Sequence, residues 1–539
     1  MDSLPSVFHY FGQKYTSGIA VTLETTIYAT CVLLALLSLE YFLRSQHHLY
    51  DIPSPPGASW IWGHEREVWE TSAGIAYANW MHQLQTNIFK IKGALRKKDI
   101  LVVADPLAIT YIMQKRIYDY PHSEVVRPRI ARLLGKSLGW VEGESEHRRM
   151  RHLVGPALSA EAIKQGAYKV FAASETLELH LEKEIIINDG AVIISVCDWV
   201  NQATIDVIGR FGFDHNFEGG KSEDALNILN SWRQMAIMGI SERGFLALMM
   251  LRRFPLLNYL PLKALKAQGD VRLNIHSGVA KELLRRSQGA STDGNDLLSR
   301  LFSAHSSDKI STDELMDHIS MFIMAGSETT SQTLGYALWE LAKNPSIQEN
   351  LRKEIMSMPG TLAYDDIQST SKLPYLDAVT RETLRFHPAA PYMERVSLKS
   401  DVLPLRHPLT TTSGRIIGEL PIEKGQTIIF PIHAIGRQDS VWGDGGSYRP
   451  ERWLETLPAA DALPTGWSHL LAFSDGPRTC TGYRLAIFQF KVILAGLIRK
   501  FRFHDTGAVI KNKVTSSMQP ITVGEEHISP RLPVKVTLV

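Results

Sequence analysis

The stretch FSDGPRTCTG places a cysteine among residues that suit a ligand-binding loop. Arg478 carries a fork of donors suited to a carboxylate, and Gly476 and Gly482 permit tight turns or the close approach of a flat ligand. The chain of 539 residues has only three cysteines, and no second Cys or His within ten residues of Cys480 completes a zinc site. The Cys480 thiol is therefore a buried structural group, a nucleophile or a single axial ligand to a metal.

A second set of reactive groups lies within a predicted helix. The segment STDELMDHISMFIMAGSETTSQTLGYALWELAKNP begins with a capping box of Ser311 and Glu314 and ends at an Asn-Pro pair, which predicts a helix of about thirty residues. Gly326 in its interior costs about 1 kcal/mol relative to alanine. Glu328 and Thr329 are an acid and an alcohol that can relay protons. The alternative is a tolerated kink in an ordinary helix.

Two pairs of polar residues also have helical spacing. Glu382 and Arg385 are three residues apart in YLDAVTRETLRFHP and share one helical face; an exposed pair of this kind stabilises a helix by only a few tenths of a kcal/mol. His147 and Arg151 are four residues apart in EGESEHRRMRHLVGPALS. The other basic residues of that segment are typical of a solvated face.

Long helical patterns are expected to position these groups. After the cysteine loop, YRLAIFQFKVILAGLIRKF has apolar residues at intervals of three or four, which predicts a buried helix. Cys480 would lie at its N-terminus, where the helix dipole favours a thiolate. Strand-like runs such as DILVVAD and GQTIIFPIHAI are short and few. The pattern predicts a mainly α fold with small β-sheets.

The N-terminal region has a different character. Residues 25–39, TTIYATCVLLALLSL, carry no charge, and the apolar run predicts one membrane-spanning helix over residues 19–43. A signal peptide is the alternative, but no small-residue cleavage site follows. The segment that follows, 44–57, contains IPSPPG and is predicted to be a stiff hinge. The net charge of +2 argues against a general nucleic-acid-binding surface.

The cysteine loop resembles the F-x-x-G-x-R-x-C-x-G-x-x-x-A signature of the cytochrome P450 haem-thiolate monooxygenases. The chain also resembles the family in AGSETT, which matches its A-G-x-E/D-T-T motif, and in its E-x-x-R motif followed by PERW. The likeness is to the microsomal, membrane-anchored type, and the chain has the look of fungal members. Every position of the cysteine signature is filled: Phe473, Gly476, Arg478, Cys480, Gly482 and Ala486.

The resemblance implies a helical prism that encloses haem b, with Cys480 as the iron ligand. The oxygen pocket would lie at Ala325 and Gly326, which leave room for dioxygen, while Glu328 and Thr329 would deliver protons. The residues that would bind the haem or its propionates are His147, Arg151, Arg395, Phe473, Gly476, Arg478 and Gly482.

A buried triad is the third implication of the resemblance. Glu382, Arg385 and Arg452 would lock the loop that presents the cysteine. Trp453 stands where the family more often has Phe, and His147 where it often has Trp. The segments MFIMAG and AAPYMERV would line a cavity for a lipophilic substrate.

The implied organisation is a lumenal segment 1–18, an anchor 19–43, a hinge 44–57 and a monooxygenase domain 58–539 on the cytosolic face of the endoplasmic reticulum. Electrons would come from NADPH through a separate membrane-bound cytochrome P450 reductase, and cytochrome b5 is a possible second donor. The basic face near Arg151 is either a solvated surface or the surface on which the reductase docks. The expected substrate is a terpenoid or another specialised metabolite. The alternatives are hydroxylation of fatty acids, sterols or xenobiotics, a haem-thiolate isomerase or dehydratase, and a non-catalytic haem sensor.

Overall fold

The computed structural model describes residues 30, 49–260, 263–287, 296–528 and 530–539. The predicted anchor, 19–43, lies outside this part of the chain apart from Thr30, and within the described residues no helix is both long and apolar enough to cross a membrane. The chain divides into a unit that ends at Ile52 and a unit that begins at Pro53. In the second unit the carbonyl of Pro53 accepts a hydrogen bond from the Lys90 N–H at 2.8 Å, which joins part of the predicted hinge to β1.

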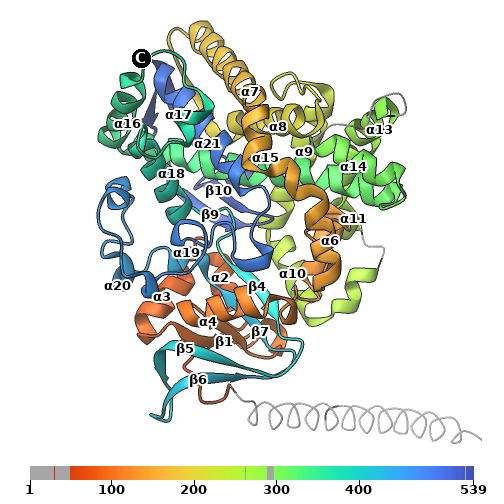
Figure 1. Ribbon diagram of the computed structural model, residues 1–539. Coiled ribbons are helices and arrows are strands. Elements are labelled where there is room, and N and C mark those ends of the chain that lie inside the picture. Colours follow the sequence, from red (N-terminus) through yellow and green to blue (C-terminus); the bar gives the residue numbers. More distant parts are fainter. Residues whose placement is uncertain (1–29, 31–48, 261–262, 288–295, 529) are drawn as a thin grey trace, which may run out of the picture. The chain divides into compact units, whose positions relative to one another are not determined.

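Helices form most of the second unit (Figure 1). They are α2 (Glu65–Glu70), α3 (Ile75–Leu84), α4 (Pro106–Thr110), α5 (Val126–Leu134), α6 (Glu144–Val154), α7 (Ala160–Ile187), α8 (Val196–Phe213), α9 (Glu223–Ile240), α10 (Glu242–Arg253), α11 (Lys263–Ala267), α12 (Asp270–Ile275), α13 (Lys281–Ser287), α14 (Leu297–Ser306), α15 (Thr312–Lys343), α16 (Pro345–Ser357), α17 (Tyr364–Gln368), α18 (Pro374–Phe386), α19 (Ile432–Ile435), α20 (Asp439–Trp442) and α21 (Tyr483–Lys500).

The strands are short. They are β1 (Ile88–Ile91), β2 (Ile100–Val103), β3 (Ala191–Ser195), β4 (Met393–Val396), β5 (Asp401–Thr410), β6 (Ile416–Ile422), β7 (Thr427–Phe430), β8 (Phe501–Asp505), β9 (Ile510–Val514), β10 (Met518–Thr522) and β11 (Pro533–Leu538).

The helix α15 is the predicted long helix. It has 32 residues, and the Ser311 hydroxyl accepts a hydrogen bond from the Glu314 backbone N–H at 3.1 Å, as the capping box predicts. Most of its side chains are buried, and it packs against α8, α18 and α21. In Figure 1, α15 runs beside α8 and α21. The helix predicted after the cysteine loop is confirmed as α21.

The described residues also form four small sheets, in agreement with the predicted fold class. One has the order β1-β2-β7-β4, with β2 and β7 parallel and the other two pairings antiparallel; three of its strands are buried along their whole length. Pairing of β4 with β7 sets Arg395 opposite Ile428. The remaining sheets are the hairpins β5–β6 and β9–β10 and the order β3-β11-β8. The β9–β10 turn brings Ser516 and Ser517 to α15.

Candidate active site

The cysteine loop is held by its own backbone. The Cys480 N–H donates to the Phe473 carbonyl at 2.8 Å, and Asp475 accepts a hydrogen bond from the Gly476 N–H at 2.7 Å. Gly476 has a φ of +65°, and a Cβ atom there would lie 2.2 Å from the carbonyl oxygen of Met113. The glycine is thus required where the loop meets the neighbouring backbone.

The Cys480 side chain keeps an accessible surface inside the protein. Burial nevertheless raises the pKa of its thiol, while the Gly482 N–H and the Arg151 guanidinium lower it. The expectation that the helix N-terminus alone would favour a thiolate is therefore outweighed by desolvation in the free protein. A coordinating metal deprotonates a thiol outright, so this protonation does not prevent ligation.

The middle of α15 presents two residues to an open space. Ala325 and Thr329 are exposed although their neighbours are mostly buried, and their spacing of four puts them on one helical face. The Thr329 hydroxyl donates to the Ala325 carbonyl at 3.1 Å. On α21, the Gln489 amide donates to the Gly326 carbonyl at 3.1 Å and to the Thr330 hydroxyl at 2.9 Å. The helix that follows Cys480 is therefore tied to α15 beside this face.

Gly326 faces a different direction. A Cβ atom there would lie 2.9 Å from both Cγ1 and Cδ1 of Ile208 on α8. The glycine therefore permits close packing of α15 against α8. This contact explains the glycine by helix packing and not by space for dioxygen. Ala325 is exposed, and its predicted role in leaving room for dioxygen stays a prediction.

Glu328 is almost fully buried, with 5 % of its surface exposed. Its Oε1 accepts hydrogen bonds from the hydroxyls of Ser516 at 2.5 Å and Ser517 at 2.6 Å. Burial raises the pKa of Glu328 to about 7, against the lowering by these hydroxyls and by Arg129. The acid can thus hold a proton near neutral pH, which a proton donor needs. The sequence did not indicate the two serines, which lie in a polar turn between strands.

Three arginines expected to bind propionates gather near the cysteine loop. Arg151 donates to the Thr479 carbonyl at 2.6 Å, and Arg478 donates to Glu142 at 2.8 Å. Arg395 is buried in β4, and its Nη1, like the Nε of Arg478, has no hydrogen-bond partner among the described residues. Burial and the charge of Arg478 lower the pKa of Arg395 to about 10. Three guanidiniums with one bound carboxylate, that of Glu142, leave a surplus of positive charge that two propionates would neutralise.

His147 is a neutral neighbour of this cluster. Its Nδ1 lies 3.0 Å from the Tyr118 hydroxyl, and burial lowers its pKa to about 4, helped by Arg478 and Arg151. Sequence reasoning missed His122, whose Nδ1 lies 2.6 Å from Glu142 and whose pKa burial also lowers to about 4. Neither histidine adds a charge to the arginines.

The predicted triad is buried. The Arg385 guanidinium donates to both carboxylate oxygens of Glu382, at 2.8 and 2.7 Å, and Arg452 donates to Oε1 at 3.1 Å. The indole N–H of Trp453 donates to Oε2 at 3.0 Å, so the tryptophan adds a donor that phenylalanine lacks. The arginines also bind backbone carbonyls of the segment that precedes the cysteine loop, including that of Ser447.

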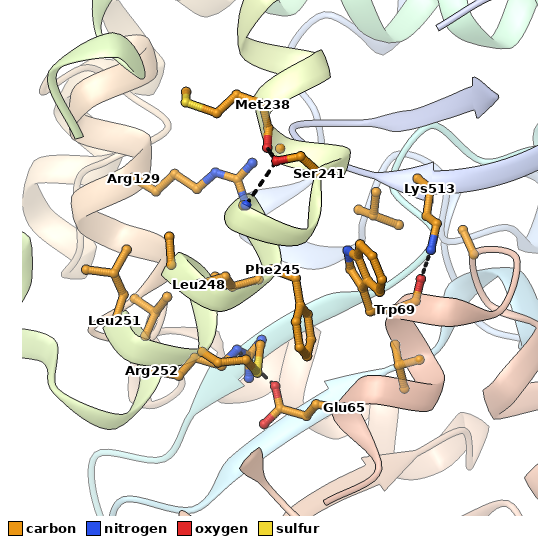
Figure 2. Close-up of a pocket in the computed structure, with 18 of the residues that line it drawn as sticks. Glu65, Trp69, Arg129, Met238, Ser241, Phe245, Leu248, Leu251, Arg252 and Lys513 are labelled. Carbon is orange, nitrogen blue, oxygen red and sulfur yellow. Dashed lines mark hydrogen bonds and ion pairs between the residues drawn. The ribbon is translucent and has the colours of Figure 1, made fainter. Parts of the chain in front are cut away.

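A cavity of about 740 Å³ opens between α2, α5, α9, α10 and β9 (Figure 2). Its wall is largely apolar and includes Met235, Phe245 and Leu248. Of the two segments expected to line a substrate cavity, AAPYMERV contributes Tyr392, whereas residues 321–326 do not border this space. Strand β9, which lines the cavity, leads into the turn whose Ser516 binds Glu328, so the cavity lies near the acid of α15.

Comparison with known proteins places these features in a family. The family model described as Cytochrome P450 matches residues 53–526. The chain is 29 % identical to Cytochrome P450 monooxygenase 205 of Postia placenta, over 90 % of this chain and 92 % of the relative. It is 32 % identical to Cytochrome P450 monooxygenase claO of Ampulloclitocybe clavipes, over 89 % and 92 %. A solved structure, the cytochrome P450DA heme domain, has a TM-score of 0.70 at 20 % identity, over 90 % of this chain and 98 % of that one.

Proposed function

Because the chain belongs to the cytochrome P450 family and is a fungal-type haem monooxygenase, we propose that it inserts one oxygen atom from O2 into a terpenoid or another lipophilic specialised metabolite. The observation that carries this proposal is the largely apolar cavity near the acid of α15. Cavities of this size bury most of the surface of a lipophilic small molecule. Electrons come from NADPH through a reductase at the endoplasmic reticulum membrane.

The residues present fit haem. Cys480 supplies the thiolate, and Arg151, Arg395 and Arg478 supply the charge that two propionates need. The chemistry that bound haem provides is the binding and cleavage of dioxygen, which thiolate ligation favours.

Side chains of the protein deliver the protons and hold the cysteine loop in position. Glu328 holds a proton near neutral pH at a buried carboxyl fixed by Ser517, and Thr329, the next residue in the chain, lies on the exposed face of α15. The triad around Glu382 fixes the segment ahead of Cys480, which keeps the thiolate in position.

The test uses the membrane-bound protein with a reductase, NADPH and isotopically labelled dioxygen, offered terpene scaffolds, sterols and fatty acids. A product with one labelled oxygen atom supports the proposal and names the substrate class. Rearranged products without label would support the isomerase or dehydratase alternative, and no product from an intact haem protein would support the sensor alternative.

Thr329→Ala is the matched variant for the proton role. We expect NADPH consumption to continue while product falls, because the alcohol that relays protons is lost. Oxidation that stays fully coupled to NADPH use in this variant would contradict the role given to Thr329.

A further inference from the structure

Arg129 is a cation inside the substrate cavity. It lies on α5, and its guanidinium extends toward Met238 and Ser241 at the turn between α9 and α10 (Figure 2). The side chain is half-buried, and it lines the cavity. Its positive charge can therefore interact with a ligand in the cavity.

No hydrogen bond or ion pair joins Arg129 to another residue in the described part of the chain. The other arginines of α5 have partners, although the Nε of Arg127 lacks a hydrogen bond. Arg127 stacks over Trp140 at 4.2 Å, and Arg132 donates to Gln268 and Asn258. Arg132, which also lines the cavity, thus has polar partners, whereas Arg129 has none among the described residues.

The carboxylates around the cavity are already engaged. Arg252 binds both Glu65 at 3.3 Å and Glu394 at 2.6 Å, and Glu328 accepts from two serine hydroxyls. Burial lowers the pKa of Arg129, as does the charge of Arg252, while Tyr392 and Glu328 raise it. A half-buried cation without a bonded anion favours an anion supplied by a ligand.

Tyr392 provides a second donor on the same cavity wall. Its ring packs edge-on against Tyr77 at 6.1 Å, and its hydroxyl has no hydrogen bond to the described residues. Burial raises the pKa of the phenol, so it remains a neutral donor. Arg129 and Tyr392 are close enough to influence each other's pKa. The arrangement is a guanidinium and a hydroxyl in an otherwise apolar space.

We propose that the cavity binds a lipophilic carboxylic acid, with its carboxylate on the guanidinium of Arg129 and the hydroxyl of Tyr392. This inference rests on the proposed function and narrows its substrate class. A planar guanidinium matches a carboxylate with two parallel hydrogen bonds. The hydrocarbon body lies against the apolar wall that Met235, Phe245 and Leu248 form. A single unpaired guanidinium favours a monoanion over a phosphate ester.

The other cations of the cavity differ from Arg129. Lys513 is held by the Trp69 carbonyl and lies 3.9 Å from the Trp69 ring centroid. Arg243 is exposed and lines the cavity from α10. Arg243→Gln therefore removes one positive charge from the edge of the cavity without touching the interior donor pair, which makes it the matched control.

The experiment measures binding to the haem-loaded protein at neutral pH by calorimetry and by the change in haem absorption. The probes are a tricyclic diterpene acid and hexadecanoic acid, each beside its methyl ester. We expect each acid to bind the wild type at least about tenfold more tightly than its ester. Arg129→Gln should weaken acid binding by about ten- to a hundredfold and leave ester binding unchanged.

Further variants sharpen the test. Arg129→Lys should weaken acid binding less than Arg129→Gln, because it keeps the charge and loses the fork. Tyr392→Phe should weaken acid binding by several-fold, and Arg243→Gln should leave it unchanged. Equal binding of acid and ester by the wild type, or equal loss of both in Arg129→Gln at unchanged haem content, would overturn the proposal.

Failure of the carboxylate-binding proposal and failure of the proposed monooxygenase function give different results. Oxidation of neutral lipophiles without any preference for acids would refute the role of Arg129 and leave the monooxygenase assignment in place. Acid binding that depends on Arg129, without labelled product from any probe, would support the binding role and count against the proposed oxidation.

Discussion

Replacing Gly326 by alanine separates a packing role from a role in the oxygen site. A Cβ atom at this position would lie 2.9 Å from two carbons of Ile208, about 0.6 Å inside a comfortable contact of about 3.5 Å. Overpacking a core costs about 1–3 kcal/mol, and alanine gains about 1 kcal/mol over glycine in a helix. We expect Gly326→Ala to lower the free energy of unfolding by up to about 2 kcal/mol.

The matched background is Ile208→Ala, which removes both crowded carbons. There, Gly326→Ala should raise the free energy of unfolding by up to about 1 kcal/mol, because only the helix-propensity gain remains. The coupling between the substitutions is then about 1–3 kcal/mol, measured by urea unfolding of all four proteins followed by circular dichroism. The same effect of Gly326→Ala in both backgrounds would refute the packing argument. If Gly326→Ala left the stability unchanged but abolished oxidation, the role of Gly326 in the oxygen site would be supported instead.

Three further substitutions test the site. Trp453→Phe should lower the free energy of unfolding by about 1–3 kcal/mol, because Glu382 loses a charge-assisted donor. Thermal unfolding checks this beside the control Trp60→Phe, at an exposed tryptophan. Equal destabilisation by the two substitutions would contradict the role of Trp453. Ser516→Ala with Ser517→Ala removes two donors to the ionised Glu328, so its pKa should rise above about 7 and the fall of coupled oxidation with increasing pH should move upward; an unchanged pH profile of kcat would count against the relay. Cys480→Ser should abolish thiolate-type haem absorption, and a normal spectrum would exclude Cys480 as the ligand.

Local signals made the long helix and the cysteine loop predictable. Ser311 stands three residues before Glu314, and that spacing alone specifies the cap that the structure contains. The signature around Cys480 occupies one short run, so each of its residues could be identified from its neighbours in the chain. The apolar spacing after the loop likewise predicted α21.

The partners of the site residues could not be predicted in this way, because they come from distant segments. Ser517 lies 189 residues after Glu328, and Glu142 lies 336 residues before Arg478. A single serine in a turn or a single glutamate in a loop has no periodicity or spacing that reveals its contact. The direction in which Gly326 faces likewise depends on how α15 packs against α8, which the sequence of α15 does not contain.

The balance of charge differs between residues that stabilise the fold and residues that bind a ligand. Around the triad, the carboxylates of Glu382 and Asp444 neutralise the guanidiniums of Arg385 and Arg452, so this cluster needs no ligand. Near the cysteine loop, Arg478 binds Glu142, the Nη1 of Arg395 has no hydrogen-bond partner among the described residues, and Arg151 binds a backbone carbonyl. In the apolar cavity, Arg129 forms no ion pair within the described part of the chain, although the charge of Glu328 raises its pKa. Since uncompensated buried charge is costly, these two unbalanced places are where anions should bind: the haem propionates at the first and a substrate carboxylate at the second.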